Sequence, residues 1–465
     1  MGKKRRRMEV LRLEVPYSSE APQLTSESVG LPRVMRRPAA SLTMDATILD
    51  AADGRLLRDG VVVAHRVVGG LGEWYIAAPR WAPSLPEEQA HPLGSNGDLP
   101  EEFARLLKPI VRHAVLGPIA AINSERDEWA LRDDDGEIAA HVKDEKVTIR
   151  RSGITTARFR EITITPTKAL TGQQRDFLLS AARAVNATVV DSYPSLQQRL
   201  GAPATGLTNF PRPEPMRRDF TLEEFATEVF AEHLQGIVRA DLERRAEQSD
   251  DLGPLNAQLW AFGRDLRGLA PVLEPGWRQS TEKALDGLPY ESAADIEAPV
   301  LDVLDALVGA VLAPRLGDLS QRPAAEVLFD RAEQATYILA DRCRALELAS
   351  PDDRWLAALR AAEQLDVAAS VAAPLFPKTM GRLLAQLEEL LDDLRGSALG
   401  AMDSDPELDG LSAGQAYQLG LDAERTRSRV RTRRAQFIER WPDRVIAARK
   451  ALAKAEKKRQ KKKKR

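Results

Sequence analysis

The sequence predicts an α+β protein in which an antiparallel β-rich domain is followed by an all-helical domain. Three observations lead to this prediction. Short segments with alternating or β-branched residues continue to about residue 190. A stretch with four prolines follows at residues 201–218, and the hydrophobic period is helical after it. With 465 residues, 43% of them hydrophobic, the chain is long enough for two or three domains.

Six segments of the first domain have the composition of strands. They are residues 8–15, 60–68, 73–78, 128–142 with a turn at Asp135-Gly136, 145–150 and 159–165. Two helices are expected between and after them, at residues 99–115 and 171–186. Thr171 and Gln174 form a capping box at the start of the second helix.

The domain boundaries follow from these patterns. We predict a basic tail at 1–7, a β domain at 8–201, a linker at 202–218, a helical domain at 219–450 and a basic tail at 451–465. Thr221 and Glu224 cap the first helix of the helical domain. Further helices continue to Trp441 and beyond.

The common catalytic motifs are missing from the sequence. There is no GxxxxGK[ST] loop, no CxxC pair and no HExxH. Residues 410–414 match GxSxG, but no strand precedes them and no histidine follows His233, so Ser412 is interpreted as a helix N-cap. The single cysteine, Cys343, lies in a helical pattern and is expected to be a buried thiol.

Charge is strongly segregated along the chain. Residues 219–424 carry 39 acidic and 17 basic side chains, a net charge of −22, whereas residues 425–465 carry 3 acidic and 19 basic ones, a net charge of +16. Lys3–Arg7 form a second basic end. Two basic ends indicate a polyanionic partner. No apolar run is long enough for a membrane span and no secretory signal is visible, so we expect a cytoplasmic protein.

Residues 48–79 resemble the middle of a CYTH domain, the eight-stranded tunnel of triphosphate-processing enzymes. The family pattern, roughly YYDTPDxxLxxxGxTLRxRxGGxxxxWxLKLP, aligns with these residues without a gap. The matching positions are Asp50, Asp53, Leu56, Gly60, Arg66, Gly69, Gly70, Trp74 and Pro79. The resemblance extends over about residues 9–201 and implies an antiparallel β-tunnel or barrel.

The resemblance also implies where a catalytic tunnel would have its side chains. The family's first strand reads ExExK, and the corresponding positions here are Glu9, Leu11 and Leu13. The later acidic strand reads Glu161, Thr163 and Thr165, so Glu9 and Glu161 are the remaining catalytic or metal-binding candidates. Arg66 and Arg126 stand at cationic family positions; nearby phosphate-binding candidates are Arg58, Lys146 and Arg160. Because leucine cannot coordinate Mg²⁺ or Mn²⁺, the substitutions predict that the tunnel is closed and inactive.

The second domain resembles a CHAD domain, a helical module associated with polyphosphate. The family's signature helix aligns with residues 257–271, where Arg264 and Arg267 persist while Ala257 stands for the histidine and Asp265 for an arginine. A second copy at 355–371 keeps Arg360. The resemblance makes Arg264, Arg267 and Arg360 further phosphate-binding candidates. Residues 416–441 resemble the closing helix, with Val430, Phe437 and Trp441 on one face.

These observations predict a divergent, non-catalytic CYTH and CHAD protein that binds polyphosphate or another phosphate polyanion and could accompany polyphosphate granules. A metal-dependent inorganic triphosphatase with rearranged ligands is one alternative, and it alone would need Mg²⁺ or Mn²⁺. A nucleic-acid-associated scaffold that uses the basic ends is the other. Because the helical domain is so acidic, we expect the polyanion contacts at the basic ends and at Arg425, Arg429 and Arg433, which share a helix face.

Overall fold

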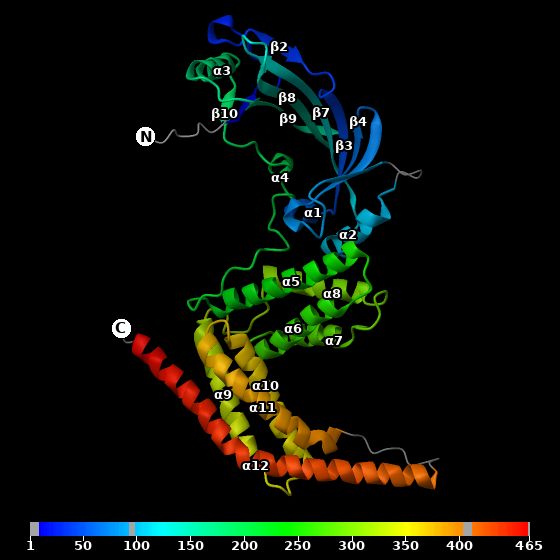
Figure 1. Cartoon of the computed structure of the whole chain (residues 1–465), viewed down its shortest axis with the longest axis vertical. Coiled ribbons are helices and arrows are strands. Elements are labelled where there is room, and N and C mark those ends of the chain that lie inside the picture. Colours follow the sequence, from blue (N-terminus) through cyan, green and yellow to red (C-terminus); the bar gives the residue numbers. More distant parts are fainter. Residues whose placement is uncertain (1–8, 93–97, 403–411, 464–465) are drawn as a thin grey trace. The chain divides into compact units, whose positions relative to one another are not determined.

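The computed structural model describes residues 9–92, 98–402 and 412–463. The chain forms two compact units (Figure 1). Unit 1 contains the residues up to Phe210 together with Asp241–Asp250, and unit 2 contains Pro211–Ala240 and the residues from Asp251 onward. The first unit is built on one antiparallel sheet and the second is helical, so the predicted α+β fold class is confirmed.

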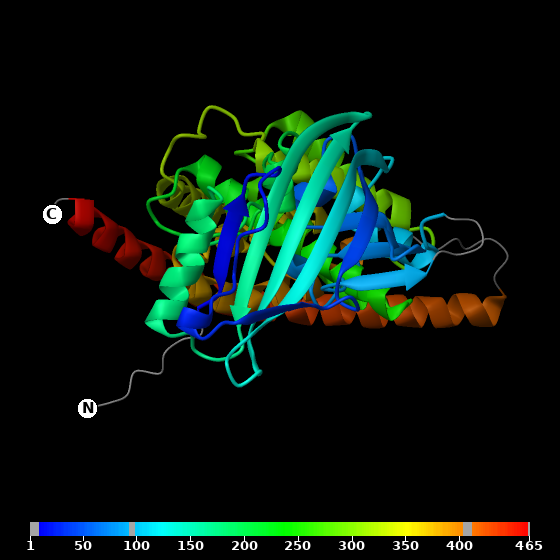
Figure 2. The same cartoon turned by 90° about the horizontal axis from the view of Figure 1, so that it is seen from above.

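Unit 1 contains a ten-stranded sheet whose paired strands are all antiparallel (Figure 2). The order is β10-β1-β9-β8-β7-β3-β4-β5-β6, and β2 pairs with β7 beside this path. The strands are β1 (Leu11–Val15), β2 (Arg33–Arg36), β3 (Leu42–Asp50), β4 (Val62–Val68), β5 (Leu71–Ala77), β6 (Gln89–Pro92), β7 (Gly117–Arg132), β8 (Ile138–Arg151), β9 (Ile154–Pro166) and β10 (Thr188–Val190). Within the described residues the pairing is therefore a path with β10 and β6 at its ends.

The helices of unit 1 are short. They are η1 (Glu27–Val29), α1 (Arg55–Arg58), η2 (Pro79–Trp81), α2 (Glu101–Val111), α3 (Gly172–Ala184) and α4 (Leu196–Leu200). The predicted capping box of α3 is present: the Gln174 backbone N–H donates to Thr171 Oγ1 at 3.1 Å, and the Thr171 N–H donates to Gln174 Oε1 at 3.0 Å. A second capping box, Ser195 with Gln198, opens α4.

The two faces of the sheet have different cores. On the face that α3 covers, Leu11 and Leu13 of β1 pack with Ile162 and Ile164 of β9 and with Leu178 of α3. On the opposite face, Leu200 of α4 belongs to a second cluster; its other buried members are Ile48, Leu57, Ala64, Ala120, Val147, Ile149 and Ala204. We call these the α3 face and the α4 face. Because side chains alternate along each strand, the register decides which face each residue joins.

Unit 2 is built from long helices. They are α5 (Leu222–Glu247), whose last residues belong to unit 1, α6 (Gly253–Leu269), α7 (Pro275–Asp286), α8 (Glu297–Leu312), α9 (Ala324–Arg344), α10 (Asp352–Ala372), α11 (Pro377–Met402) and α12 (Ala413–Lys463). The predicted cap of α5 is present, because the Glu224 N–H donates to Thr221 Oγ1 at 3.2 Å. Cys343 is fully buried as expected, and burial raises the pKa of its thiol to about 12.

Helix α12 packs on the rest of unit 2 through the middle of its length. Phe437 and Val430 are buried, and Phe437 contacts Trp355 of α10 with ring centroids 5.5 Å apart. Arg434 is also buried, donating to Ser397 O at 3.1 Å and pairing with Asp352 at 2.5 Å. The contacts of Phe437 and Arg434 hold the middle of this arginine-rich helix against the rest of unit 2.

Several elements differ from the sequence prediction. Strands β2, β3, β6 and β10 were not predicted, and β7 begins at Gly117 rather than at 128. The two segments 138–142 and 145–150 form one strand, β8. Lys143 and Asp144, which separate them in the sequence, continue the strand, with their side chains on opposite faces of the sheet. The turn at Asp135-Gly136 is confirmed: the Gly136 N–H donates to Asp133 O at 3.0 Å.

The predicted linker and tail also differ from the structure. Residues 202–210 pack on unit 1, where Asn209 and Phe210 are buried and the Asn209 N–H donates to Asp59 Oδ1 at 3.1 Å. The backbone of α12 remains helical to Lys463, so most of the predicted basic tail at 451–465 belongs to a helix. The N-terminal basic tail lies outside the described residues. Among the helices that the structure describes, every one is too short or too polar to span a bilayer.

We expect Leu13→Ala to destabilise the protein by about 2–5 kcal/mol, because the side chain is 1% exposed and the change leaves a cavity in the α3-face core. Urea unfolding of the full chain measures this cost. The matched control is Leu71→Ala on β5, where the side chain is 78% exposed and a change of about 0.5 kcal/mol or less is expected. Equal effects of the two substitutions would contradict the assignment of Leu13 to the core.

Candidate functional site

A row of three glutamates crosses neighbouring strands of the α4 face. Glu145 of β8 is the register partner of Glu161 of β9, and Glu161 is the register partner of Glu14 of β1. Side chains at directly opposed positions of antiparallel strands lie about 4.5–5.5 Å apart at Cβ, and like charges at such positions repel. The row therefore requires cations beside it.

Three cations compensate the glutamate row. Arg199 of α4 donates from one Nη to Glu14 at 2.6 Å and to Glu161 at 2.9 Å. Lys143 lies 2.9 Å from the second oxygen of Glu145, and Arg126 of β7 lies 3.4 Å from the first. Ser124 donates to Glu145 at 2.8 Å. Three carboxylates and three cations thus form one neutral network.

Glu161 and Glu145 have different affinities for protons. Burial raises the pKa of Glu161 above its ordinary value; the Arg199 hydrogen bond opposes this, and the charge of Glu145 adds to it. Burial also raises the pKa of Glu145, but hydrogen bonds from Lys143 and Ser124 and the positive charges nearby outweigh it and leave the pKa lowered. On acidification Glu161 is therefore protonated before Glu145.

Two guanidinium groups of the network have unused donors. Nε of Arg126 and Nε of Arg199 are buried, and neither has a hydrogen-bond partner among the residues that the structure describes. The guanidinium group of Arg199 also stacks on the ring of Phe159, with Cζ 4.1 Å from the ring centroid. An unpaired buried N–H is costly, so the two positions are suited to an added acceptor.

A further cation lies on the same face of β4. Arg66 pairs with Glu73 at 2.5 Å and stacks on Tyr75 with its Cζ 3.6 Å from the ring centroid. Burial and the nearby Glu88 raise the pKa of Tyr75 to about 12, so its phenol stays protonated. Arg66 and Arg126, the two family-position arginines, are thus both on the α4 face.

The expected grouping of Glu9 with Glu161 is wrong. Leu11 and Leu13 are register partners of Ile164 and Ile162, so they share the α3 face, opposite to Glu161. Glu9 is exposed and pairs with Arg175 of α3 at 3.0 Å. The residues of β1 on the face of Glu161 are Arg12 and Glu14. Leu11 and Leu13 therefore do not close a site beside Glu161; they belong to the other core.

Three of the predicted phosphate-binding cations lie elsewhere. Arg160 is buried on the α3 face, paired with Asp144 at 2.5 Å and donating to Ser19 O at 2.6 Å. Lys146 is the register partner of Arg160 and shares that face. Arg58 of α1 pairs with Asp53 at 3.1 Å. These residues do not join Arg66 and Arg126.

The glutamate row does not fit a divalent metal as it stands. Its oxygens are the hard ligands that Mg²⁺ prefers. However, Arg199 lies between Glu14 and Glu161, and Lys143 occupies Glu145. Within the described ranges, no three acidic, histidine or cysteine side chains are placed to hold one ion. The three carboxylates are therefore held by cations of the chain itself.

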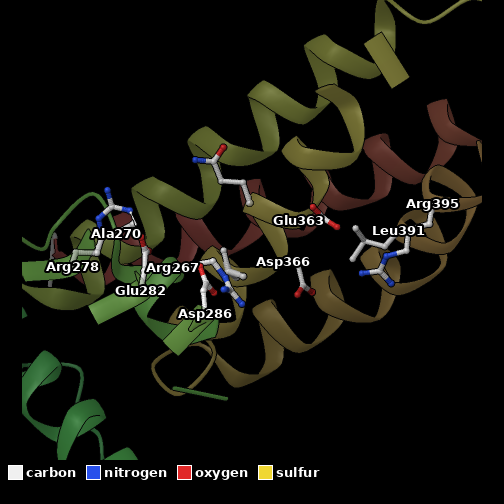
Figure 3. A pocket seen from close by; sticks show the side chains of 11 residues that line it. Arg267, Ala270, Arg278, Glu282, Asp286, Glu363, Asp366, Leu391 and Arg395 are labelled. Atoms are coloured by element: carbon white, nitrogen blue, oxygen red, sulfur yellow. Dashed lines mark hydrogen bonds and ion pairs between the residues drawn. The ribbon is translucent and has the colours of Figure 1, made fainter. Parts of the chain in front are cut away.

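The signature arginines of unit 2 are near a cavity. Arg267 lines a cavity of about 660 Å³ between α6, α7, α10 and α11 (Figure 3). Arg264 is half exposed, 3.6 Å from Asp265, and Arg360 is exposed on α10 and does not line the cavity. Asp265, the substitution noted in the signature helix, pairs with His233 of α5 at 2.9 Å.

Arg425, Arg429 and Arg433 of α12 differ in exposure and in their ion pairs. Arg425 and Arg429 are exposed, and Arg425 pairs with Asp422 at 3.0 Å. Arg433 lies 3.4 Å from Asp392 and 3.5 Å from Asp393 of α11, so it is partly neutralised. The three residues thus differ in their availability to a ligand.

Sequence reasoning missed the residues that complete the α4-face network: Glu14, Lys143, Glu145 and Arg199. A one-residue shift of the first strand's inward positions, from Glu9-x-Leu11-x-Leu13 to Val10-x-Arg12-x-Glu14, would have found Glu14. Alternation along 141–147 places Lys143 and Glu145 on one face. Arg199 has no such signal, because α4 reaches the sheet only through the tertiary fold.

The comparisons with known proteins are limited to weak structural similarities. No family model and no curated protein matches the chain. A candidate adenylyl cyclase from Hippeastrum, described as having a dominant triphosphatase activity, is 14% identical, with 40% of this chain and 91% of that one covered and a TM-score of 0.23. A protein from Pyrococcus horikoshii is 12% identical, with 41% and 94% covered and a TM-score of 0.22. A candidate adenylate cyclase from Bacillus halodurans is 11% identical, with 35% and 83% covered and a TM-score of 0.19. Similarities at these values assign neither a ligand nor an activity to this chain.

We expect Glu145→Gln to lower the free energy of unfolding at pH 7 by about 1–3 kcal/mol, because the amide has no negative charge and only one acceptor oxygen, whereas the carboxylate accepts from both Lys143 and Ser124. The pKa of Glu145 is lowered in the folded protein, so its contribution is present above the ordinary carboxyl pKa and is lost as the pH falls through the folded value. Urea unfolding from pH 7 to pH 3 should show the two proteins converging. Glu9→Gln, at an exposed pair, is the control and should change stability by about 1 kcal/mol or less.

Proposed function

We propose that this chain is a binding protein for a phosphate polyanion, and that the α4 face of unit 1 receives a linear oligophosphate without a divalent metal. The observation that carries the proposal is the pair of buried Nε donors, on Arg126 and Arg199, for which the described part of the chain provides no acceptor. Phosphate oxygens are strong acceptors with the geometry that a guanidinium group binds best.

The cations of the face support this ligand class. Arg66 of β4, Arg126 of β7, Lys143 of β8 and Arg199 of α4 come from four different elements and lie on one side of the sheet. A chain of phosphates has a negative charge at each unit and can contact several of them in turn. The sequence resemblances to the CYTH and CHAD families point to the same class of ligand.

The glutamates of the α4 face compete with a phosphate for the same cations. Each of the cations is paired with a glutamate, so an incoming phosphate must compete with Glu14, Glu73, Glu145 or Glu161. Glu161 is the weakest competitor, because its raised pKa makes it the first to lose its charge on acidification. Affinity for phosphate is therefore expected to rise as the pH falls toward the range in which Glu161 is protonated.

Metal-dependent triphosphate hydrolysis is the second candidate. It is favoured by the register itself, which brings three carboxylates to neighbouring positions of one face. The two candidates make opposite demands on Glu161. In a binding site without metal this carboxylate repels the ligand, whereas in a metal site it is a ligand of the metal.

We expect Glu161→Gln to bind inorganic tripolyphosphate about three- to tenfold more tightly than the unchanged protein at pH 7, since one repelling charge is removed and Arg199 is partly released. Arg199→Gln should weaken binding about tenfold or more. Titration calorimetry in EDTA measures both. Arg150→Gln is the matched control, because Arg150 is an exposed cation of the opposite face of β8 and should change affinity less than twofold.

We expect no release of phosphate from tripolyphosphate or ATP with Mg²⁺ or Mn²⁺, because the carboxylates are held by Arg199 and Lys143. A phosphate-release assay checks this. Turnover that depends on metal and is abolished by Glu161→Gln would reject the binding-only proposal and establish the hydrolase.

The basic ends provide a third arm of the same test. A variant that lacks residues 1–7 and 451–465 should keep its affinity for tripolyphosphate, since the α4-face residues are unchanged. Its affinity for long polyphosphate and for RNA should fall, with a smaller salt dependence, if the ends contact phosphates as their charge predicts. Loss of tripolyphosphate binding by this truncation would place the ligand on the ends and reject the α4 face.

A further inference from the structure

Polar and apolar side chains occupy different halves of the α4 face. Along β8, Lys143 and Glu145 are followed on the same face by Val147 and Ile149. The neighbouring strands have the same order: on β7 Arg126 and Ser124 are next to Ile122 and Ala120, and on β9 Glu161 is next to Phe159 and Ala157. The charged network therefore borders the apolar cluster on three adjacent strands.

The apolar half of the face is filled by side chains. Leu57 of α1, Leu200 of α4 and Ala204 belong to one cluster with Val147 and Ile149, and all five residues are buried. Side chains in such a core are packed as densely as molecules in an organic crystal, so this half leaves no passage along the strands. A ligand reaches the charged network from the opposite side.

Exposure falls along β8 toward the apolar half. The side chains of Lys143 and Glu145 are 36% and 14% exposed. The residues that follow on the same face, Val147 and Ile149, are 8% and 0% exposed. The network is therefore open at Lys143 and closed at Val147.

The donors without an acceptor include one at the closed side. The guanidinium group of Arg199 stacks on Phe159, which packs against the apolar cluster. Nε of Arg199 is buried, as is Nε of Arg126, and the described part of the chain provides an acceptor for neither. A group that reaches Nε of Arg199 must fit beside the filled half of the face.

The end of a phosphate chain meets this demand better than its interior. An internal phosphate has two free oxygens and continues through bonds on both sides. A terminal phosphate has three free oxygens and one such bond, and above its second pKa, about 6, it carries an additional negative charge. Charged acceptors make the stronger hydrogen bonds to a guanidinium group.

We propose that the α4 face recognises the terminal phosphate of an oligophosphate and excludes the interior of a phosphate chain. This inference rests on the proposed function and adds a specificity to it. The terminal phosphate accepts from Nε of Arg199 next to Phe159, and the rest of the chain extends outward past Lys143. Inorganic oligophosphates and nucleoside oligophosphates both have such an end.

Ligands of equal net charge, with and without a chain end, test the inference. At about pH 8, ADP has the same net charge as cyclic trimetaphosphate and diadenosine triphosphate, but only ADP has a terminal phosphate. Titration calorimetry of the full chain in EDTA should show ADP binding at least about tenfold more tightly than either. Equal or tighter binding of trimetaphosphate or diadenosine triphosphate would overturn the inference.

Charge-removing variants locate the chain end. In Arg199→Gln the preference for ADP over trimetaphosphate should fall to about threefold or less, because the donor that selects the end is removed. Arg150→Gln removes an exposed cation of the opposite face and should leave the preference unchanged. A full preference in Arg199→Gln would contradict the placement of the end at Arg199.

Tripolyphosphate separates failure of the inference from failure of the proposed function. No tripolyphosphate binding, or binding that does not depend on Arg199, would reject both. Binding that depends on Arg199 but does not distinguish ADP from trimetaphosphate would overturn the inference alone.

ATP distinguishes the two sources of a phosphate end. Because one free end is sufficient, ATP and tripolyphosphate should both bind, and the tighter of the two identifies a nucleotide or an inorganic chain as the source. Tripolyphosphate binding without ATP binding would mean that both ends of the chain are required, which would overturn the inference.

Discussion

The register between β1 and β9 is the constraint on which the rest of unit 1 depends. It joins Leu11 and Leu13 to Ile162 and Ile164 in the core under α3, and by alternation it places Glu14 beside Glu161 on the opposite face. A shift of one residue would exchange these sets. It would bury Glu14 beside Ile162, Ile164 and Leu178 and place Leu11 and Leu13 on the face of Glu161, so the apolar core and the charged network are fixed by the same pairing.

The charged network follows from that register because three glutamates come into line. Such a row is stable only with cations beside it, and the cations come from neighbouring strands and from α4. The short helix α4 contributes to both the core and the network. Its Leu200 packs in the core of the α4 face, and its Arg199 donates to Glu14 and Glu161. The packing of α4 on the sheet therefore also brings the positive charge of Arg199 to the glutamate row.

The two units combine charges in different ways. In unit 1 the charges of the α4 face are paired within the protein, and the buried Nε donors of Arg126 and Arg199 in this network lack an acceptor among the described residues. In unit 2 most of the charged side chains that line the cavity are exposed to solvent, within a segment, residues 219–424, that carries a net charge of −22. The same residue types are therefore paired within the protein on the α4 face of unit 1 and mostly exposed at the cavity of unit 2.

The sequence by itself determined the fold class, the order of the units, the caps at Thr171 and Thr221, the burial of Cys343 and the place of Phe437 in a packed helix face. These features depend on local chemistry or on a period that one segment displays. Only the tertiary structure decided which residues of β1 face Glu161, because the strand MEVLRLEV has charged residues on both faces and its pattern does not choose between them. The partners of Arg160, Arg199 and Asp265 were likewise decided by the fold, since each pairs with a residue on another element. The partner of a charged side chain is a neighbour in space, and the residue spacing within one strand does not reveal which residue of another element that neighbour will be.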